Sequence, residues 1–284
     1  DPVFKPGRMN SYSNSGYVLL SFIIEDVTGM NYSEALQDII CKPLGLKNTY
    51  HGKKINTDAN EVLSYTYGNG IWHLEQETDM SIPMGGGSIV STSSDLVIFF
   101  DALFEGKLVS MENLERMKEM KNNYGAGLFS YPFYDKTTYG HTGGIDGFRS
   151  MAVRFPEDDV TVALVSNGMN YDQNQFMIDA MKTFFDMEFD MPEFKKNVIL
   201  DAELLEKYSG DWTSETFPMD VKIFVENGTL KAMASGQTSF PLSPLSSTEF
   251  EFTPASVEIK FIEEDNKLQM EMTQFGTSHK FDLK

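Results

Sequence analysis

The stretch Tyr12-Ser13-Asn14-Ser15-Gly16-Tyr17 opens an apolar segment that ends at Gly29. Asn14 or Ser15 can cap a helix at its start, because a short polar side chain accepts a hydrogen bond from the first free backbone N–H groups. Gly29 stands where a helix C-terminus favours glycine. The segment after the Tyr12-Ser13-Asn14 triplet is therefore predicted to be a helix.

Residues downstream of this helix predict a layer of helices and a sheet. A second helix is expected from about Tyr32 to Cys41, stopped by Pro43 and Gly45. Residues 46–84 are expected to be mostly loop. The later expected elements are helices at 92–104 and 110–121, strands at 125–131, 147–155 and 160–167, a hairpin turn at Pro156-Glu157-Asp158-Asp159, and a helix at about 173–185. Helices followed by strands indicate an α+β fold in which helices back an antiparallel sheet.

The hydrophobic pattern changes after a boundary expected near residues 192–197, which separates a first domain at 1–192 from a second at 198–284. Val221, Ile223 and Val225 alternate with polar residues, and Asn227-Gly228 is a dipeptide that tight hairpin turns favour. Short alternating strands at regular spacing predict a small all-β sandwich or barrel.

Composition excludes several classes of function. The 284 residues carry a formal net charge of −19, which repels nucleic-acid phosphates, and no basic stripe offsets it.

The single cysteine, Cys41, is interpreted as a buried structural thiol. The four histidines are too scattered in sequence to indicate a metal site, and no cofactor is expected. No apolar run reaches transmembrane length, and no signal peptide opens the chain.

Two motifs in order, Tyr12-Ser13-Asn14 and His141-Thr142-Gly143-Gly144, carry a family resemblance, with Pro43-Leu44-Gly45-Leu46 between them. Together they resemble the β-lactamase-related serine hydrolases, a family of class C β-lactamases, penicillin-binding proteins, D-aminopeptidases and esterases. The resemblance covers roughly residues 1–190 and implies that family's antiparallel sheet with helices. It also implies a periplasmic or secreted location. The tail, from Tyr208-Ser209-Gly210-Asp211-Trp212 onward, resembles the lipocalin-like barrels that follow many such hydrolases.

The resemblance implies a role for each motif residue. A serine hydroxyl is a poor nucleophile until a base takes its proton. In the family, the serine and lysine of Ser-x-x-Lys and the tyrosine of Tyr-x-Asn share this work. Carried over, Tyr12 is the base candidate, Asn14 positions substrate, and His141 stands in place of a lysine. Thr142 and Gly143 line the cleft, and the Gly144 N–H forms half of the oxyanion hole.

Each of these residues also has an ordinary structural interpretation. Tyr12 could be a packed or surface aromatic, Asn14 a helix cap, and His141 a strand-end residue without a catalytic part. The turn Gly85-Gly86-Gly87-Ser88 lacks the Gly-Lys-Ser/Thr of a phosphate loop. It is interpreted either as a plain helix-entry loop or as the family's glycine-rich turn beside the cleft.

The sequence departs from the family in one respect, since Ser-x-x-Lys occurs nowhere in it. We therefore expect the segment that carries the nucleophile to be missing from the front of this chain. We also expect that segment, or a neighbouring chain, to cover an exposed sheet edge. Three functions remain open: an acyl-serine hydrolase of amides or esters, a non-catalytic protein that binds peptidoglycan peptides or other small ligands, and a carrier of lipophilic ligands in the tail.

Overall fold

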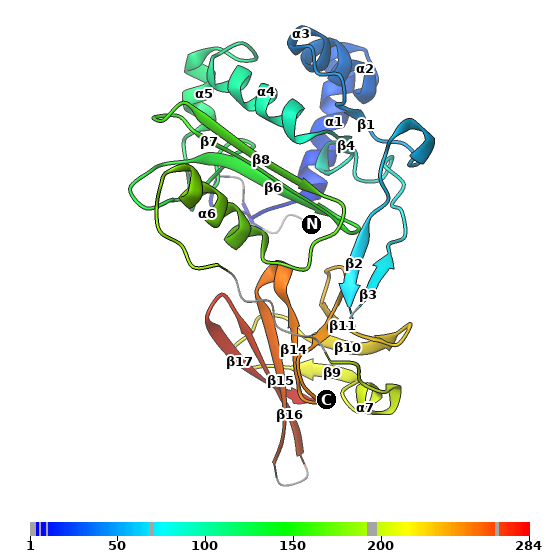
Figure 1. Ribbon diagram of the computed structural model, residues 1–284. Coiled ribbons are helices and arrows are strands. Elements are labelled where there is room, and N and C mark those ends of the chain that lie inside the picture. Colours follow the sequence, from blue (N-terminus) through cyan, green and yellow to red (C-terminus); the bar gives the residue numbers. More distant parts are fainter. Residues whose placement is uncertain (1–3, 6, 10, 69–70, 192–197, 265–266) are drawn as a thin grey trace. The chain divides into compact units, whose positions relative to one another are not determined.

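The computed structural model describes residues 4–5, 7–9, 11–68, 71–191, 198–264 and 267–284. They form two compact units (Figure 1). The first comprises residues 1–63 and 76–167, and the second comprises residues 64–75 and 168–284. The boundary expected near 192–197 is at residues outside the described set. Residues 64–75 and 168–191, which sequence assigned to the first domain, cluster with the second unit.

The first unit combines helices with a four-stranded sheet. Its elements are α1 (Asn14–Thr28), α2 (Tyr32–Leu36), η1 (Gln37–Cys41), α3 (Lys42–Leu44), β1 (Tyr50–His51), η2 (Thr57–Ala59), η3 (Met84–Gly86), β4 (Ile89–Val90), α4 (Ser93–Phe104), α5 (Met111–Met117), β5 (Phe129–Ser130), β6 (Tyr139–Ile145), β7 (Phe148–Phe155) and β8 (Val160–Ser166). The sheet is antiparallel in the order β5-β6-β7-β8. Helix α4 packs against β7 and β8, and Phe100 lies in a core with Leu128 and Ala152.

Helix α1 begins one residue earlier than the cap prediction required. Ser13, rather than Asn14 or Ser15, is the cap, and its Oγ accepts a hydrogen bond from the Gly16 N–H at 3.1 Å. Ser13 has an extended backbone, whereas Asn14 is already helical, so Ser13 alone has the geometry of a cap. The predicted end is confirmed, because Gly29 closes the helix with φ of 68°.

The second predicted helix does not stop at Pro43. A π-helical turn, η1, interrupts it, and the Lys42 N–H bonds to the Gln37 carbonyl five residues back. Proline has no N–H and its ring collides with the carbonyl four residues earlier in an α-helix. A widened turn accommodates such a residue. The chain therefore passes Pro43 and ends the helix at Gly45, whose φ is 67°.

The predicted strands are confirmed in part. The turn after Phe155 is confirmed, since β7 and β8 pair from Phe155↔Val160 onward. The strand expected at 125–131 is reduced to Phe129–Ser130. Gly127 has φ of 76°, and Gly125 packs against the Met117 carbonyl, so the chain before Phe129 is folded into turns.

The second unit confirms the prediction of a small barrel-like β fold. Its elements are β2 (Tyr65–Gly68), β3 (Ile71–Leu74), α6 (Gln173–Phe184), α7 (Ala202–Glu206), β9 (Gly210–Thr213), β10 (Val221–Glu226), β11 (Thr229–Ala234), β12 (Phe240–Pro241), β13 (Ser243–Pro244), β14 (Glu249–Phe252), η4 (Thr253–Ala255), β15 (Val257–Glu264), β16 (Lys267–Gln274) and β17 (Thr277–Leu283). Sequence reasoning missed the β2–β3 hairpin. Residues 46–84 were expected to be mostly loop, and residues 69–70, between the two strands, lie outside the described residues.

Nine strands make one antiparallel sheet in the order β12-β11-β10-β9-β17-β16-β15-β14-β13. The two end strands are consecutive in the chain, with only Leu242 between them, so the sheet is nearly closed. Large side chains fill its interior. Trp212 is fully buried and donates its indole N–H to the Tyr208 carbonyl at 3.3 Å, while the Tyr208 ring stacks on Phe261 at 4.0 Å. Trp212 is thus a core residue of this unit.

Candidate active site

Tyr12 and His141, 129 positions apart in the sequence, lie side by side in the first unit. Their ring centroids are 6.2 Å apart, with an interplanar angle of 39°. Tyr12 is half exposed and directly precedes the Ser13 cap of α1, while His141 lies on β6. The start of α1 and the middle of β6 therefore meet at one place, with Asn14 in the first turn of the helix. The catalytic roles assigned to these residues stay predictions.

A cluster of aromatic rings joins the two motifs. The Phe129 ring lies 4.6 Å from His141, 6.1 Å from Tyr12 and 4.6 Å from Tyr124. Tyr131 stacks on Phe129 at 5.9 Å. Sequence reasoning passed over these three aromatics. The signal was present in the expected strand 125–131, because residues 129 and 131 share one face of a strand.

Backbone pairing fixes the glycines of the His-Thr-Gly motif. Thr142, Gly143 and Gly144 pair with Met151, Ser150 and Arg149 across the β6–β7 ladder. Gly144 is exposed, and a Cβ atom there would lie 3.3 Å from Arg149 Nη1. The Nη1 atom donates to the Phe148 carbonyl at 2.7 Å. An exposed backbone at Gly144 agrees with the oxyanion role expected of its N–H, which remains a prediction.

The turn that follows β6 is hydrogen-bonded to Thr78, in the loop that leads to the glycine-rich turn. Asp146 has φ of 50° and accepts hydrogen bonds from the Thr78 N–H at 3.0 Å and the Thr78 hydroxyl at 2.6 Å. Asparagine and aspartate tolerate this left-handed conformation better than most residues. These two bonds fix the β6–β7 turn and, with it, the register of the His-Thr-Gly motif.

The pKa of the Tyr12 hydroxyl in this chain does not suit a general base. Burial raises the pKa of the Tyr12 hydroxyl above its usual 10, and the neighbouring Tyr17 and Tyr124 raise it further. The phenol is therefore protonated at neutral pH in this chain. A nearby cation lowers a tyrosine pKa, so the site needs a positive charge close to Tyr12, such as the lysine of Ser-x-x-Lys, before Tyr12 can accept a proton.

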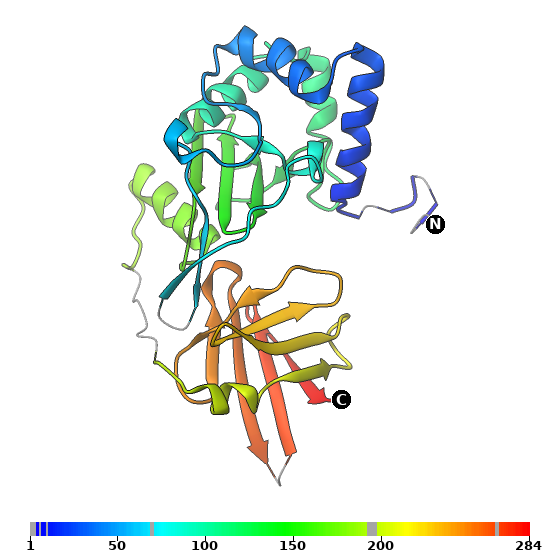
Figure 2. The ribbon, with the colours of Figure 1, turned by 90° about the vertical axis from the view of Figure 1, so that its right-hand side faces the viewer.

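The glycine-rich turn packs against the start of α1. A Cβ atom on Gly85 would lie 2.7 Å from the Tyr17 carbonyl oxygen, and one on Gly86 would lie 3.0 Å from the Asn14 carbonyl oxygen. Real Cβ atoms do not approach as closely as 2.7 Å, and 3.0 Å is tighter than most of their contacts, so glycine allows η3 to lie this close to the helix. Figure 2 shows α1 beside this part of the first unit.

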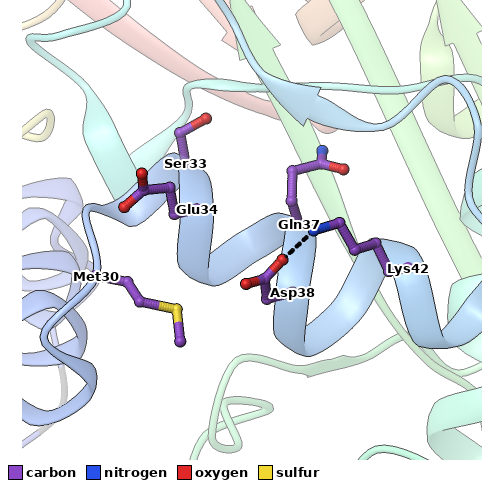
Figure 3. A pocket seen from close by; sticks show the side chains of 6 residues that line it. All are labelled: Met30, Ser33, Glu34, Gln37, Asp38 and Lys42. Atoms are coloured by element: carbon purple, nitrogen blue, oxygen red, sulfur yellow. Dashed lines mark hydrogen bonds and ion pairs between the residues drawn. The ribbon is translucent and has the colours of Figure 1, made fainter.

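An open hollow in the first unit is separate from the motif residues. Figure 3 shows its lining residues, Met30, Ser33, Glu34, Gln37, Asp38 and Lys42, with the ion pair between Lys42 and Asp38. Both charges of that pair are largely exposed. An exposed pair of this kind contributes little energy, and the hollow does not contain any of the candidate catalytic groups.

Gly140 provides a test of how β6 is placed. A Cβ atom there would overlap the backbone carbonyl of Ala152 on β7, whereas one on Gly143 would meet only the movable Ser150 side chain. We expect Gly140→Ala to lower the free energy of unfolding by about 3 kcal/mol or more, and Gly143→Ala by about 1 kcal/mol. Urea unfolding checks both values.

A second substitution tests the cause of the two costs. Adding Ser150→Ala should restore the stability of the Gly143 variant and leave that of the Gly140 variant unchanged. Equal costs for both glycines would contradict the β6–β7 register.

A sequence model of one family, described as Beta-lactamase, matches residues 1–181. The chain belongs to the beta-lactamase family. This is a family of serine hydrolases, and both motifs described above lie within the matched residues. Among the described residues, no helix is long and apolar enough to cross a membrane.

Curated relatives of the beta-lactamase family extend beyond this chain. Penicillin-binding protein 4* of Bacillus subtilis (strain 168) is 27% identical over 285 residues, which cover 91% of this chain and 62% of that protein. A putative D-alanyl-D-alanine carboxypeptidase of Escherichia coli (strain K12) is 24% identical over 203 residues, covering 58% of this chain and 46% of that protein. The chain thus spans less than two thirds of each.

Solved structures show the same fold. A D-stereospecific amidohydrolase from Streptomyces sp. has 30% identity and a TM-score of 0.54, covering 59% of this chain and 53% of its own. The octameric penicillin-binding protein homologue from Pyrococcus abyssi has a TM-score of 0.55 at 23% identity, and it covers 99% of this chain and 66% of its own. The similarity to the Pyrococcus abyssi structure extends over the second unit, called the barrel unit below after its nine-stranded sheet. This similarity concerns the fold alone.

Proposed function

We propose that this chain supplies the Tyr-x-Asn and His-Thr-Gly half of an acyl-serine hydrolase site, and that polypeptide outside these 284 residues supplies the nucleophile. The observation that carries the proposal is the 6.2 Å approach of the Tyr12 and His141 rings. This approach brings together two motifs that lie 129 positions apart in the sequence.

The proposed reaction follows from the groups at this place. The serine oxygen attacks the substrate carbonyl while its proton passes to the pair of Tyr12 and the incoming lysine. The carbonyl oxygen becomes an anion that the Gly144 N–H and the N–H of the serine stabilise. The leaving amine or alcohol takes up the proton, and water then cleaves the acyl-serine ester by the same steps. Asn14 and Thr142 hold the substrate, and Gly143 leaves room for it.

The substrate class that we propose is an amide or ester of a D-amino acid, including peptides that end in D-alanine. Support comes from the relatives, since a D-stereospecific amidohydrolase and a D-amino acid amidase from Ochrobactrum anthropi SV3 match at 30% and 28% identity. The putative D-alanyl-D-alanine carboxypeptidase points the same way. Substrates of that kind occur in bacterial cell walls, so we place the protein outside the cytoplasm.

The exposed side of helix α1 supports a proposal for where the nucleophile segment would bind. Ser21 is its only buried residue among those described, and it faces Gly85. Exposed apolar side chains cover the rest of the helix: Tyr17, Leu19, Leu20, Phe22, Ile23, Ile24 and Val27. Stable monomers rarely expose a contiguous apolar patch above a few hundred Å². We therefore propose that the nucleophile segment, or a neighbouring chain, covers α1 and the sheet edge at β8.

The experiment is a hybrid in which a Ser-x-x-Lys segment from an active family member is fused ahead of residue 1. A serine-directed fluorophosphonate should label the folded hybrid at that serine and should not label the 284-residue chain. Serine→Ala in the added segment is the matched control. Labelling of the 284-residue chain at any of its own serines would show that the nucleophile lies elsewhere.

A second function, ligand binding without catalysis, is favoured by the absence of Ser-x-x-Lys from the sequence. The same experiment separates the two. A folded hybrid that binds a D-alanyl peptide in calorimetry but is neither labelled nor active supports the binding protein. Labelling together with ester turnover supports the hydrolase.

A further inference from the structure

A buried serine and a histidine form a hydrogen-bonded pair behind the glycine-rich turn. Ser88 is fully buried, and its Oγ lies 2.7 Å from His51 Nδ1. Its backbone is held as well, because the Ser88 N–H donates to the Met84 carbonyl at 2.9 Å and the Gly52 N–H donates to the Ser88 carbonyl at 2.7 Å. Two of these bonds attach the turn to His51 at the end of β1 and to the following Gly52, and the third closes the turn on itself.

The direction of the side-chain hydrogen bond follows from burial. Within the part of the chain that the structure describes, no acceptor other than His51 Nδ1 lies within reach of the Ser88 hydroxyl. A buried hydroxyl that donates to nothing costs about 1–3 kcal/mol. The hydroxyl therefore donates to Nδ1, which requires a neutral imidazole with its proton on Nε2. Protonation of His51 would place a second hydrogen between the two atoms and leave the serine proton without an acceptor.

The groups around His51 favour the same neutral form. Burial lowers the pKa of His51 below 6.5, the nearby Lys53 lowers it further, and Glu25 on α1 acts in the opposite direction. The Tyr32 ring on α2 stands edge-on to the imidazole at 5.8 Å, and burial raises the pKa of its hydroxyl, which stays neutral. The hydrogen-bond partner of His51 Nδ1 is the Ser88 Oγ atom.

The glycine-rich turn connects Ser88 to the candidate active site, because the same turn packs against α1. Gly85 and Gly86 lie three and two residues before Ser88, and they approach α1 so closely that a Cβ atom on them would lie 2.7 Å from the Tyr17 carbonyl oxygen and 3.0 Å from the Asn14 carbonyl oxygen. There is no side chain at either glycine to absorb a shift. A movement of the turn therefore moves the N-terminal turn of α1, where Asn14 lies.

We propose that His51 is a positioning residue that, through Ser88 and the glycine-rich turn, holds Asn14 in place while the imidazole is neutral and releases it when the imidazole is protonated. The importance of Asn14 for catalysis rests on the proposed function. The coupling between His51 and Asn14 does not, since it is a property of the first unit alone.

The sign of the pH effect follows from the depressed pKa. The unfolded chain takes up a proton at His51 near pH 6.5, and the native chain takes it up at a lower pH. Stability contributed by the pair is complete above pH 6.5 and decreases as the pH falls below it. We expect Asn14 to lose its position at the lower pH at which His51 of the native chain takes up its proton.

The test is an NMR titration of the 284-residue chain from pH 8 to pH 5. The His51 imidazole should titrate with a midpoint below 6.5, and the backbone amides of Gly85, Gly86 and Asn14 should shift with that same midpoint. In Ser88→Ala, the His51 midpoint should change and the Asn14 amide should no longer follow it. An Asn14 amide that does not titrate with His51 in the unaltered chain would overturn the proposal.

Two further variants keep the test decisive. His51→Asn offers Ser88 a side-chain oxygen that does not titrate, so the Asn14 amide should stay at its high-pH position down to pH 5. His279→Gln, which changes a histidine of β17 in the second unit, should leave the Asn14 titration unchanged. In the unlabelled hybrid that carries the nucleophile, His51→Asn should move the acid limb of kcat to lower pH. An inactive hybrid would count against the proposed function, whereas the NMR result decides the coupling.

Discussion

Changing Tyr12 to Phe in the active hybrid should lower the turnover number by about 10²–10⁴-fold, the usual contribution of a positioned proton-transfer group. The phenylalanine ring keeps the contacts with Phe129 and His141, whose centroids lie 6.1 and 6.2 Å away. Folding should therefore be nearly unchanged, and the loss should appear in kcat, measured with an activated ester.

Tyr124→Phe is the matched control for this prediction. Tyr124 belongs to the same ring cluster, at 4.6 Å from Phe129, but it lies outside both motifs. Its hydroxyl should be dispensable, with turnover within about threefold of the parent hybrid. If the two variants retain the same turnover, Tyr12 has no part in proton transfer.

Changing Trp212 to Ala should destabilise the barrel unit by about 3–5 kcal/mol, the range for removing a buried aromatic side chain. Trp212 is fully buried, packs its ring against Phe261 at 5.6 Å, and donates a hydrogen bond to the Tyr208 carbonyl. Denaturant unfolding should show the transition of the barrel at lower urea. Circular dichroism follows the transition in both proteins, because Trp212→Ala removes the fluorescence of Trp212 and leaves only that of Trp72, which is half exposed.

A matched comparison is available in Phe275, which is 69% exposed. Phe275→Ala should change the barrel transition by less than about 0.5 kcal/mol, as is usual for surface substitutions. A Trp212 variant that unfolds at the same urea concentration as the parent would mean that the interior of the sheet is not packed around this ring.

Elements with a strong local signal were predictable from the sequence. Gly29 ends α1, and Asn227-Gly228 joins β10 to β11, because left-handed backbone at a helix end or hairpin turn is expensive for most other residues. The alternation of Val221 and Ile223 predicted a half-buried strand, and both side chains lie in the core of the barrel unit.

Features set by tertiary contacts were not predictable. The choice of Ser13 as cap depends on where the backbone turns from extended to helical, and several adjacent polar residues offered the same chemistry. The π-helical turn before Pro43 keeps a helix going where proline usually stops it. The close packing of Gly85 and Gly86 on α1, and the Ser88–His51 pair behind them, join segments that the sequence leaves unrelated.

The candidate site also combines residues that could be predicted from the sequence with residues that could not. The motif residues Tyr12, Asn14, His141, Thr142, Gly143 and Gly144 came from resemblance, and the structure brings the rings of Tyr12 and His141 together. The aromatic residues between them were missed, since Phe129 and Tyr124 contact the motifs only after the turns before β5 have formed. Local patterns reveal neither such turns nor the packing that they produce.

The near closure of the barrel at Leu242 has a consequence for amide hydrogen exchange. The strands that meet there, β12 and β13, have two residues each, whereas β15 and β16 pair over eight positions and β16 and β17 over six. A short ladder is held by few cooperative bonds and opens before a long one. Exchange should therefore be fastest around Leu242 and slowest in the middle of β16. The barrel unit would then open by splitting along one seam while its long hairpins persist, so that its last protected amides mark those hairpins.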